Sequence, residues 1–145
     1  MKNSSENFNQ LFNSPSTIKV SSHARVNLIG EHTDYTGGYV MPSLLPYKTT
    51  IFLNGNNEKN YSVFSEYFNE NFKFNDFIKS KSNDWLDYIK GCLFVFFDEN
   101  KKIKNIYLKI YIKSDIPMGR GISSSSALCV GVIKALNNFF ETGFN

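Results

Sequence analysis

The sequence predicts a mixed α+β domain in which strands and helices are interleaved along the chain. Three observations carry this prediction. Several segments alternate apolar and polar residues with the period of a strand. Two longer segments repeat apolar residues every three or four positions, as an amphipathic helix does. The two kinds of segment are mixed rather than grouped, and 41% hydrophobic with 20% charged residues is an ordinary globular composition.

The first part of the chain is predicted to be a polar lead-in, a strand and a long loop. Residues 1–16 are rich in Asn and Ser, with at most one helical turn around Leu11 and Phe12. A strand then begins at Ile18, where apolar and polar residues start to alternate. Residues 30–46 are rich in Gly, Pro, Thr and Asp, and we expect them to form mostly turn and loop.

Three further strands are predicted next. The apolar run over 49–53 forms one, and Asn54-Gly55 after it is a hairpin-type turn signal. Shorter strands are expected over 61–64 and 72–77.

The second half is predicted to run helix, strand, helix. Asn83 or Asp84 caps the first helix, whose apolar face is formed by Trp85, Tyr88, Ile89, Cys92, Leu93 and Phe96. The clearest alternation in the chain follows over 106–113, and a glycine- and serine-rich loop then leads into a final helix. We expect no segment to be left that could cover the second face of the sheet, which indicates that the sequence is truncated. The chain thus divides into 1–16, 17–58 and 59–145.

Charge and cysteine content narrow the class of protein. The net charge is only +3 with both signs interspersed, so no basic face is expected to bind nucleic acid or a membrane. The longest apolar run, Cys92 to Phe97, is far shorter than the ~20 residues that span a bilayer. The start lacks the apolar core of a signal peptide. Cys92 and Cys129 lie in apolar helical contexts and are expected to be buried free thiols, which favours the cytoplasm.

A glycine- and serine-rich loop, residues 115–127, is a candidate phosphate site. It runs from the strong strand into the last helix, where unpaired amides and the helix dipole favour an anion. Gly119 and Gly121 allow close backbone approach, and the serine hydroxyls suit phosphate oxygens or Mg²⁺. A tight turn with a capped helix accounts for the same residues about equally well. The loop is neither a Walker loop nor a dinucleotide fingerprint.

A second polar loop follows the first strand. It places Glu31, His32 and Asp34 between glycines, and carboxylates accept strong hydrogen bonds from the hydroxyls of a sugar. Arg25 precedes it, and a guanidinium stabilises the charge on a transferring phosphoryl group. The alternatives are a solvated turn, a structural role for His32, and, less favoured because adjacent ligands strain a loop, a metal site.

Together the two loops resemble the galactokinase branch of the GHMP kinases. The resemblance rests on Arg-Val-Asn-Leu-Ile-Gly-Glu-His-Thr-Asp-Tyr-Thr-Gly-Gly-Tyr at 25–39 and on Pro-Met-Gly-Arg-Gly-Ile-Ser-Ser-Ser-Ser-Ala at 117–127. Trp-Leu-Asp-Tyr-Ile-Lys-Gly at 85–91 is similar to the family's helix between them. The matches follow the family's order and cover roughly residues 18–140.

The resemblance implies a role for each matching position. Arg25 matches an arginine that stabilises the transition state. The sugar-binding tetrapeptide corresponds to Glu31, His32, Thr33 and Asp34. The nucleotide loop corresponds to Gly119, Arg120, Gly121, Ile122, Ser123, Ser124 and Ser125. Ser125 also matches the serine that binds Mg²⁺, and Ser65 matches, over a shorter stretch, a serine that contacts the nucleotide.

Two departures from the family pattern stand out. His23-Ala24 replaces the usual Pro-Gly before Arg25, which predicts a different turn there. Arg120 replaces a small residue in the nucleotide loop. The family's catalytic aspartate, acidic Mg²⁺ ligand and third motif are expected beyond residue 145.

The implied fold is an incomplete N-terminal GHMP kinase domain, similar to ribosomal protein S5 domain 2. The implied reaction is ATP- and Mg²⁺-dependent phosphorylation of galactose to galactose 1-phosphate, with these 145 residues inactive alone. The implied partners are small-molecule substrates, and no protein partner is inferred. The alternatives are a kinase for another sugar such as N-acetylgalactosamine, a non-catalytic regulator that binds sugar and ATP, and a nonfunctional fragment.

Overall fold

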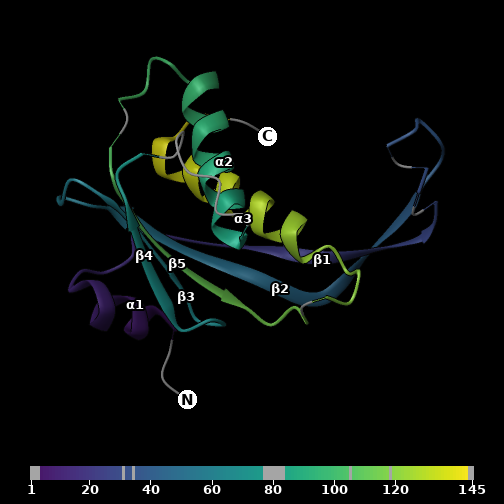
Figure 1. Ribbon diagram of the computed structural model, residues 1–145, viewed down its shortest axis with the longest axis horizontal. Helices are drawn as coiled ribbons and strands as arrows, with labels where there is room; N and C mark the ends of the chain where they lie inside the picture. The colour runs from purple at the N-terminus through teal and green to yellow at the C-terminus, as the bar shows by residue number, and fades with distance from the viewer. Residues whose placement is uncertain are drawn as a thin grey trace.

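The described residues form one five-stranded sheet with helices on both faces (Figure 1). The computed structural model describes residues 4–30, 32–33, 35–76, 84–104, 106–117 and 119–143. Its strands are β1 (Ile18–Ile29), β2 (Met41–Gly55), β3 (Tyr61–Ser65), β4 (Glu70–Phe74) and β5 (Leu108–Ser114). Its helices are α1 (Ser4–Phe12), α2 (Trp85–Glu99) and α3 (Ser124–Phe140). The predicted α+β class is confirmed.

The strand order is β1-β2-β5-β3-β4, so the last strand in the sequence lies at the centre of the sheet. β5 is antiparallel to β2 on one side and parallel to β3 on the other. The predicted hairpin turn at Asn54-Gly55 is therefore wrong, because Gly55 still belongs to β2 and pairs with Leu108 of β5. β5 takes this place because Ile110 and Tyr111, on opposite faces of the strand, are both buried, which suits a strand covered on both sides.

Helices α2 and α3 cover one face of the sheet and enclose the main core. Ile51, Leu53 and Ile110 of the sheet pack there against buried side chains of the helices, among them Ile89, Leu93, Val132, Ala135 and Leu136. The predicted cap of α2 is confirmed at Asp84, whose carboxylate accepts a hydrogen bond of 2.8 Å from the Leu86 amide. The alternative cap, Asn83, lies outside the described residues.

Helix α1 covers part of the opposite face. Phe8 and Phe12 pack against Phe52 of β2 and Tyr111 of β5, with Phe64 at the edge of the cluster. Where at most one helical turn was predicted, the structure has a helix of nine residues, and the second face that was expected to be bare is partly covered. The helix was missed because Asn and Ser dominate its sequence, and tertiary contacts outweighed their weak helix propensity.

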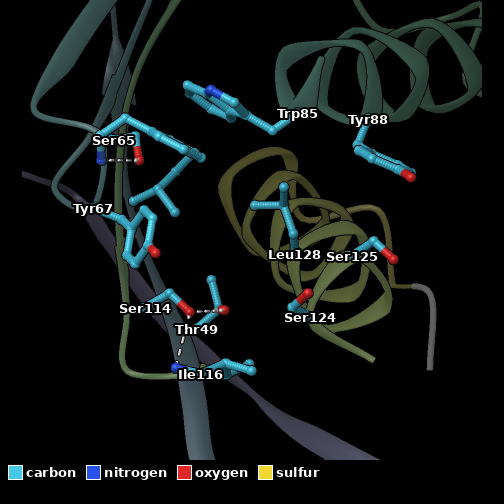
Figure 2. Close-up of a pocket in the computed structure, with 12 residues that line it drawn as sticks. Thr49, Ser65, Tyr67, Trp85, Tyr88, Ser114, Ile116, Ser124, Ser125 and Leu128 are labelled. Carbon is cyan, nitrogen blue, oxygen red and sulfur yellow. Dashed lines mark hydrogen bonds between the residues drawn. The ribbon is translucent and has the colours of Figure 1, made fainter. Parts of the chain in front are cut away.

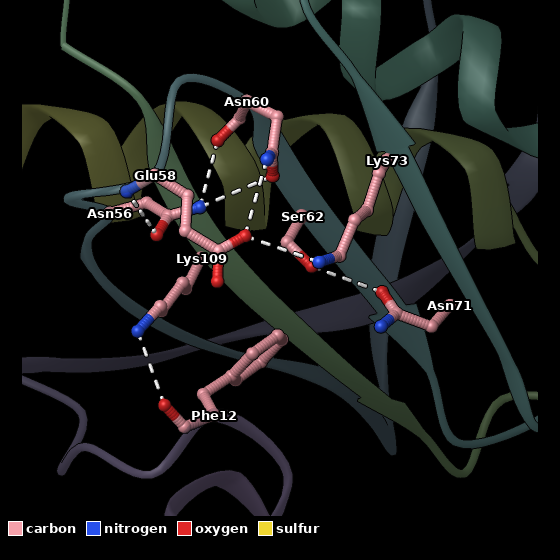
Figure 3. A network of polar contacts seen from close by, with 8 residues as sticks. All are labelled: Phe12, Asn56, Glu58, Asn60, Ser62, Asn71, Lys73 and Lys109. Carbon is pink, nitrogen blue, oxygen red and sulfur yellow. Dashed lines mark hydrogen bonds and ion pairs between the residues drawn. The ribbon is translucent and has the colours of Figure 1, made fainter.

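A polar network holds the end of α1 and the β3–β4 hairpin beside β5 (Figure 3). Lys109 of β5 donates to the carbonyl of Phe12 at 3.1 Å, and Lys73 of β4 pairs with Glu58 at 3.1 Å. Hydrogen bonds from Lys73 and Asn60 to the Glu58 carboxylate lower its pKa. The Lys73–Glu58 ion pair is exposed, so it fixes geometry more than it adds stability.

The β1–β2 hairpin extends away from the helices (Figure 1). Residues 41–46, predicted as loop, belong to β2 instead. Pro42 is tolerated there because β5 pairs with β2 only from Thr49 onward, so this part of β2 has a free edge. None of the helices in the described part of the chain has the length and apolar character that crossing a bilayer requires.

Candidate nucleotide-binding site

A pocket of about 280 Å³ opens between the sheet and the two helices α2 and α3 (Figure 2). Its walls come from all the elements that meet there, including the first turn of each helix and the ends of β3 and β5. The lining residues are Thr49, Ser65, Tyr67, Phe68, Trp85, Tyr88, Ile112, Ser114, Ile116, Ser124, Ser125 and Leu128. Ser65, Ser124 and Ser125 were predicted nucleotide contacts, and the fold brings these three into one cavity.

One end of this pocket is formed by the first turn of α3, where Ser124 and Ser125 line it. The Ser123 side chain makes no capping hydrogen bond, so it does not occupy the amides at the helix start. Gly119 and Gly121 have φ of +70° and +68°, and the space beside their Cα atoms is open. These glycines are therefore required by backbone conformation, and there is room above the loop for an anion. Met118, between them and the strand, lies outside the described residues.

Not every residue of the predicted loop lines the pocket. Five of the predicted contacts are not among its lining residues: Gly119, Arg120, Gly121, Ile122 and Ser123. Of these, Arg120 is exposed. Ile122 packs in a small cluster with Ala24, Ile116 and Ala127, and its carbonyl accepts a hydrogen bond of 3.4 Å from the Arg25 amide. The loop is thus attached to β1.

Aromatic side chains form the other end of the pocket, and sequence reasoning assigned them to the core. Trp85 stacks on Phe68 with ring centroids 5.5 Å apart and planes 15° apart. Tyr88 follows one turn along α2, lines the pocket and is 50% exposed, so it is not a core residue. The signal that could have found them is an aromatic pair at i and i+3 in the first turn of a helix, where a ligand can reach both rings.

Hydroxyl groups line the floor between these two ends. Ser65 is 4% exposed, and its Oγ accepts a hydrogen bond of 3.4 Å from the Phe68 amide. Thr49 and Ser114 share a hydrogen bond of 2.9 Å across β2 and β5. The pocket therefore pairs an apolar aromatic slot with hydroxyl donors, which suits a ligand with a flat ring and a polar tail.

Arg25 lies on β1 where the pairing with β2 shifts register. Its Nε is buried, and no described residue accepts a hydrogen bond from it. Ala24 is fully buried and does not have a positive φ, so Ala fits here without strain. The sequence predicted a different turn here, and in this chain His23 and Ala24 lie within β1.

The polar loop is only partly described. Glu31 and Asp34 lie outside the described residues. His32 is exposed, and its Nδ1 lies 3.4 Å from the Tyr35 hydroxyl. The Thr33 hydroxyl donates to the carbonyls of Gly30 and Tyr39, at 3.1 and 3.2 Å, and so closes the loop on itself. Within the described residues, no three His, Cys, Asp or Glu side chains gather as metal ligands would.

Comparison with known families and proteins agrees with this geometry. Residues 6–54 match the galactokinase galactose-binding signature, and residues 87–145 match the GHMP kinases N-terminal domain. A galactokinase from Pyrococcus furiosus is 43% identical over 87% of this chain and 35% of its own length. One from Fusobacterium nucleatum is 32% identical over 97% of this chain and 37% of its own.

A solved structure gives the same result. The crystal structure of Lactococcus lactis galactokinase complexed with galactose superposes with a TM-score of 0.82 at 30% identity. The superposed region makes up 97% of this chain and 37% of the Lactococcus lactis chain. The chain therefore spans about a third of the length of these relatives. By its two matched segments and its fold, the chain belongs to the GHMP kinase family and to the galactokinase branch within it.

Proposed function

We propose that these residues form the nucleotide- and sugar-binding part of an ATP-dependent kinase that converts galactose to galactose 1-phosphate. The observation that carries the proposal is the pocket, which joins an aromatic slot to the uncapped start of α3. A flat base and a triphosphate, linked by a ribose, need those two environments at opposite ends of one cavity.

Each end of the pocket has a separate task. Trp85 and Tyr88 hold the adenine ring by stacking, which is worth ~1–3 kcal/mol per base. The amides at the start of α3 donate to the phosphate oxygens, and the positive end of the helix dipole lowers their energy. The hydroxyl of Ser65 is positioned to orient the nucleoside. Together these contacts fix the phosphates in place, and positioning is most of what a phosphoryl transfer requires.

Arg25 on β1 stabilises charge, and the loop that follows β1 binds the sugar. Arg25 has a buried Nε that lacks an acceptor among the described residues, so a phosphoryl oxygen is a fitting partner. Glu31 and Asp34 accept hydrogen bonds from sugar hydroxyls, with His32 and Thr33 in the same loop. The galactose in the Lactococcus lactis structure supports this choice of sugar, because that protein shares the signature-bearing fold.

A magnesium ion fits beside the phosphates. The Ser124 and Ser125 hydroxyls both line the pocket at the helix start, and Mg²⁺ prefers oxygen ligands. We assign the protein ligand to Ser125. When bound, the ion neutralises part of the phosphate charge.

A fluorescence titration tests the nucleotide site directly. Trp85 is the single tryptophan of the chain and lines the pocket, so its emission reports ligand entry. We expect ATP with Mg²⁺ to change that emission saturably, and inorganic triphosphate to compete for the site while leaving the emission nearly unchanged. Unchanged emission with ATP, together with calorimetry that detects no binding, would contradict the proposal.

A further inference from the structure

Two cysteines lie directly behind the nucleotide pocket, on the two helices that form its wall. Cys92 on α2 is one turn beyond Tyr88, and Cys129 on α3 is one turn beyond Ser125. Residues four apart on a helix share a face, so both thiols stand next to pocket-lining side chains. Neither cysteine is among the residues that line the pocket.

The two thiols are neighbours across the α2–α3 contact. Both are free, and the Cys92 thiol donates to the carbonyl of Cys129 at 3.8 Å. Cys92 is 8% exposed, whereas Cys129 is half-buried, so a small reagent can reach Cys129 first. Both contact the main core, which keeps the two helices in register at this point.

The environment gives the two sulfurs different reactivity. Side-chain hydrogen bonding between the two sulfurs lowers the pKa of Cys129 to about 7, against the opposing effect of burial. The same hydrogen bond and burial raise the pKa of Cys92. Near neutral pH a large share of Cys129 is therefore thiolate, the form that attacks oxidants, beside a second thiol that remains protonated.

We propose that Cys92 and Cys129 are a thiol modification site, which a hydroperoxide converts to a disulfide joining α2 to α3. In the first step the Cys129 sulfur attacks the peroxide: an S–O bond forms, the O–O bond breaks, and hydroxide leaves. In the second step the Cys92 sulfur attacks that sulfenic acid, forming the S–S bond as water leaves. Overall, two thiols are oxidised by two electrons and one peroxide is reduced to two waters or to water and an alcohol.

The disulfide changes the wall of the pocket. The two sulfurs of a disulfide lie ~2.05 Å apart, so the two free thiols must approach each other and draw the helices together at this turn. Tyr88 and Ser125, one turn away, move with them. This consequence for nucleotide binding rests on the proposed function, whereas disulfide formation does not.

The first experiment follows the chemistry alone. We expect the reduced 145-residue chain, treated with hydrogen peroxide, to lose about 2 Da and both of its titratable thiols as a monomer. Cys92→Ala is expected to stop at a sulfenic acid that dimedone traps on Cys129. Cys129→Ala is expected to react much more slowly, because a buried thiol with a raised pKa remains. A wild-type chain that yields only the trapped sulfenic acid, or only disulfides between chains, overturns the proposal.

The second experiment measures ATP affinity before and after oxidation, with Trp85 emission as the signal. We expect a change on the order of fivefold or more, reversed by dithiothreitol and absent in Cys92→Ala. Equal affinity of the two forms would refute the link to the pocket. If neither form binds ATP while the disulfide still forms, the proposed function fails and the modification site stands.

Discussion

Glycine 121 makes the phosphate loop a sensitive single-residue test of the site. Its φ of +68° is a conformation that a β-branched residue adopts only with strain, although the space beside it is open. We expect Gly121→Val to abolish ATP binding, because the loop must move away from the helix start. Gly143→Val is a matched control, since Gly143 has a similar φ of +73° and open space but lies beyond α3.

Calorimetry with ATP, alongside circular dichroism, distinguishes the possible outcomes. Both variants should keep the helix and strand content of the parent chain. Normal ATP binding by Gly121→Val would show that the loop does not hold the phosphates. Equal loss in both variants would indicate general destabilisation instead.

Tyr111 should make stability depend on alkaline pH. Burial, then the hydrogen bond of 2.7 Å that its hydroxyl donates to Glu66, raises its pKa to about 12. A raised pKa means that the neutral form is favoured by folding, so this contribution is complete below about pH 10. It is lost as the pH rises from there through about 12.

Urea denaturation of the parent chain and of Tyr111→Phe at several alkaline pH values measures this effect. We expect the difference in unfolding free energy between the two chains to shrink as the pH rises above 10. The other tyrosines and the lysines titrate in both chains and cancel in the difference. A constant difference would contradict the assignment.

At the scale of elements, α1 is predicted to be part of the folded domain rather than an appendage. Phe8 is fully buried and lies 4.8 Å from Phe12 between ring centroids. Phe8→Ala should therefore cost about 3–5 kcal/mol of stability. Leu11→Ala on the same helix is the control, because Leu11 is 38% exposed and should cost far less. Equal, small losses measured by urea denaturation would mean that α1 does not dock in solution.

The elements also show what local sequence could and could not predict. The alternation over 106–113 identified β5 within two residues, because a buried strand needs that pattern wherever it lies. The same pattern carries no information on partners, so it could not reveal that β5 separates β2 from β3. Asn54-Gly55 is a turn signal only for chains whose flanking strands pair with each other.

The candidate site was also predictable from the sequence only in part. The glycine turn and the start of α3 were predictable because glycines followed by serines before an apolar helix leave a local signature over 119–125, whereas the phosphate-binding role of this loop stays a prediction. The aromatic slot was not predictable, since Trp85 and Tyr88 fit an amphipathic helix equally well as core residues. Only the fold shows that both side chains line the pocket (Figure 2).

At the scale of the whole molecule, we expect these 145 residues to bind nucleotide without transferring its phosphate. A sugar hydroxyl must lose its proton to a base within hydrogen-bond reach. Among the described residues, those that line the pocket are hydroxyl-bearing, aromatic or aliphatic, and none is a carboxylate or an imidazole. We propose Glu31 and Asp34 as sugar ligands rather than as the catalytic base.

An assay for ADP and sugar phosphate checks this expectation. The chain should show ATP binding by Trp85 emission and no turnover with galactose. Turnover above a preparation of Gly121→Val would mean that the base lies within these residues, and the sugar loop would then be the place to look for it.

The central position of β5 also sets the order in which the sheet can form during synthesis. β1 pairs with β2, and β3 pairs with β4. In the sheet, β2 and β3 are not hydrogen-bonded neighbours, because β5 lies between them and pairs with both. β5 begins only at Leu108. A ribosome adds ~5–20 residues per second, so the two hairpins emerge seconds before the strand that unites them. Isolated hairpins are at best marginally stable in water. A nascent chain that pauses before Ser114 therefore exposes the unpaired edges of β2 and β3. We expect chaperones to bind the chain most during this interval.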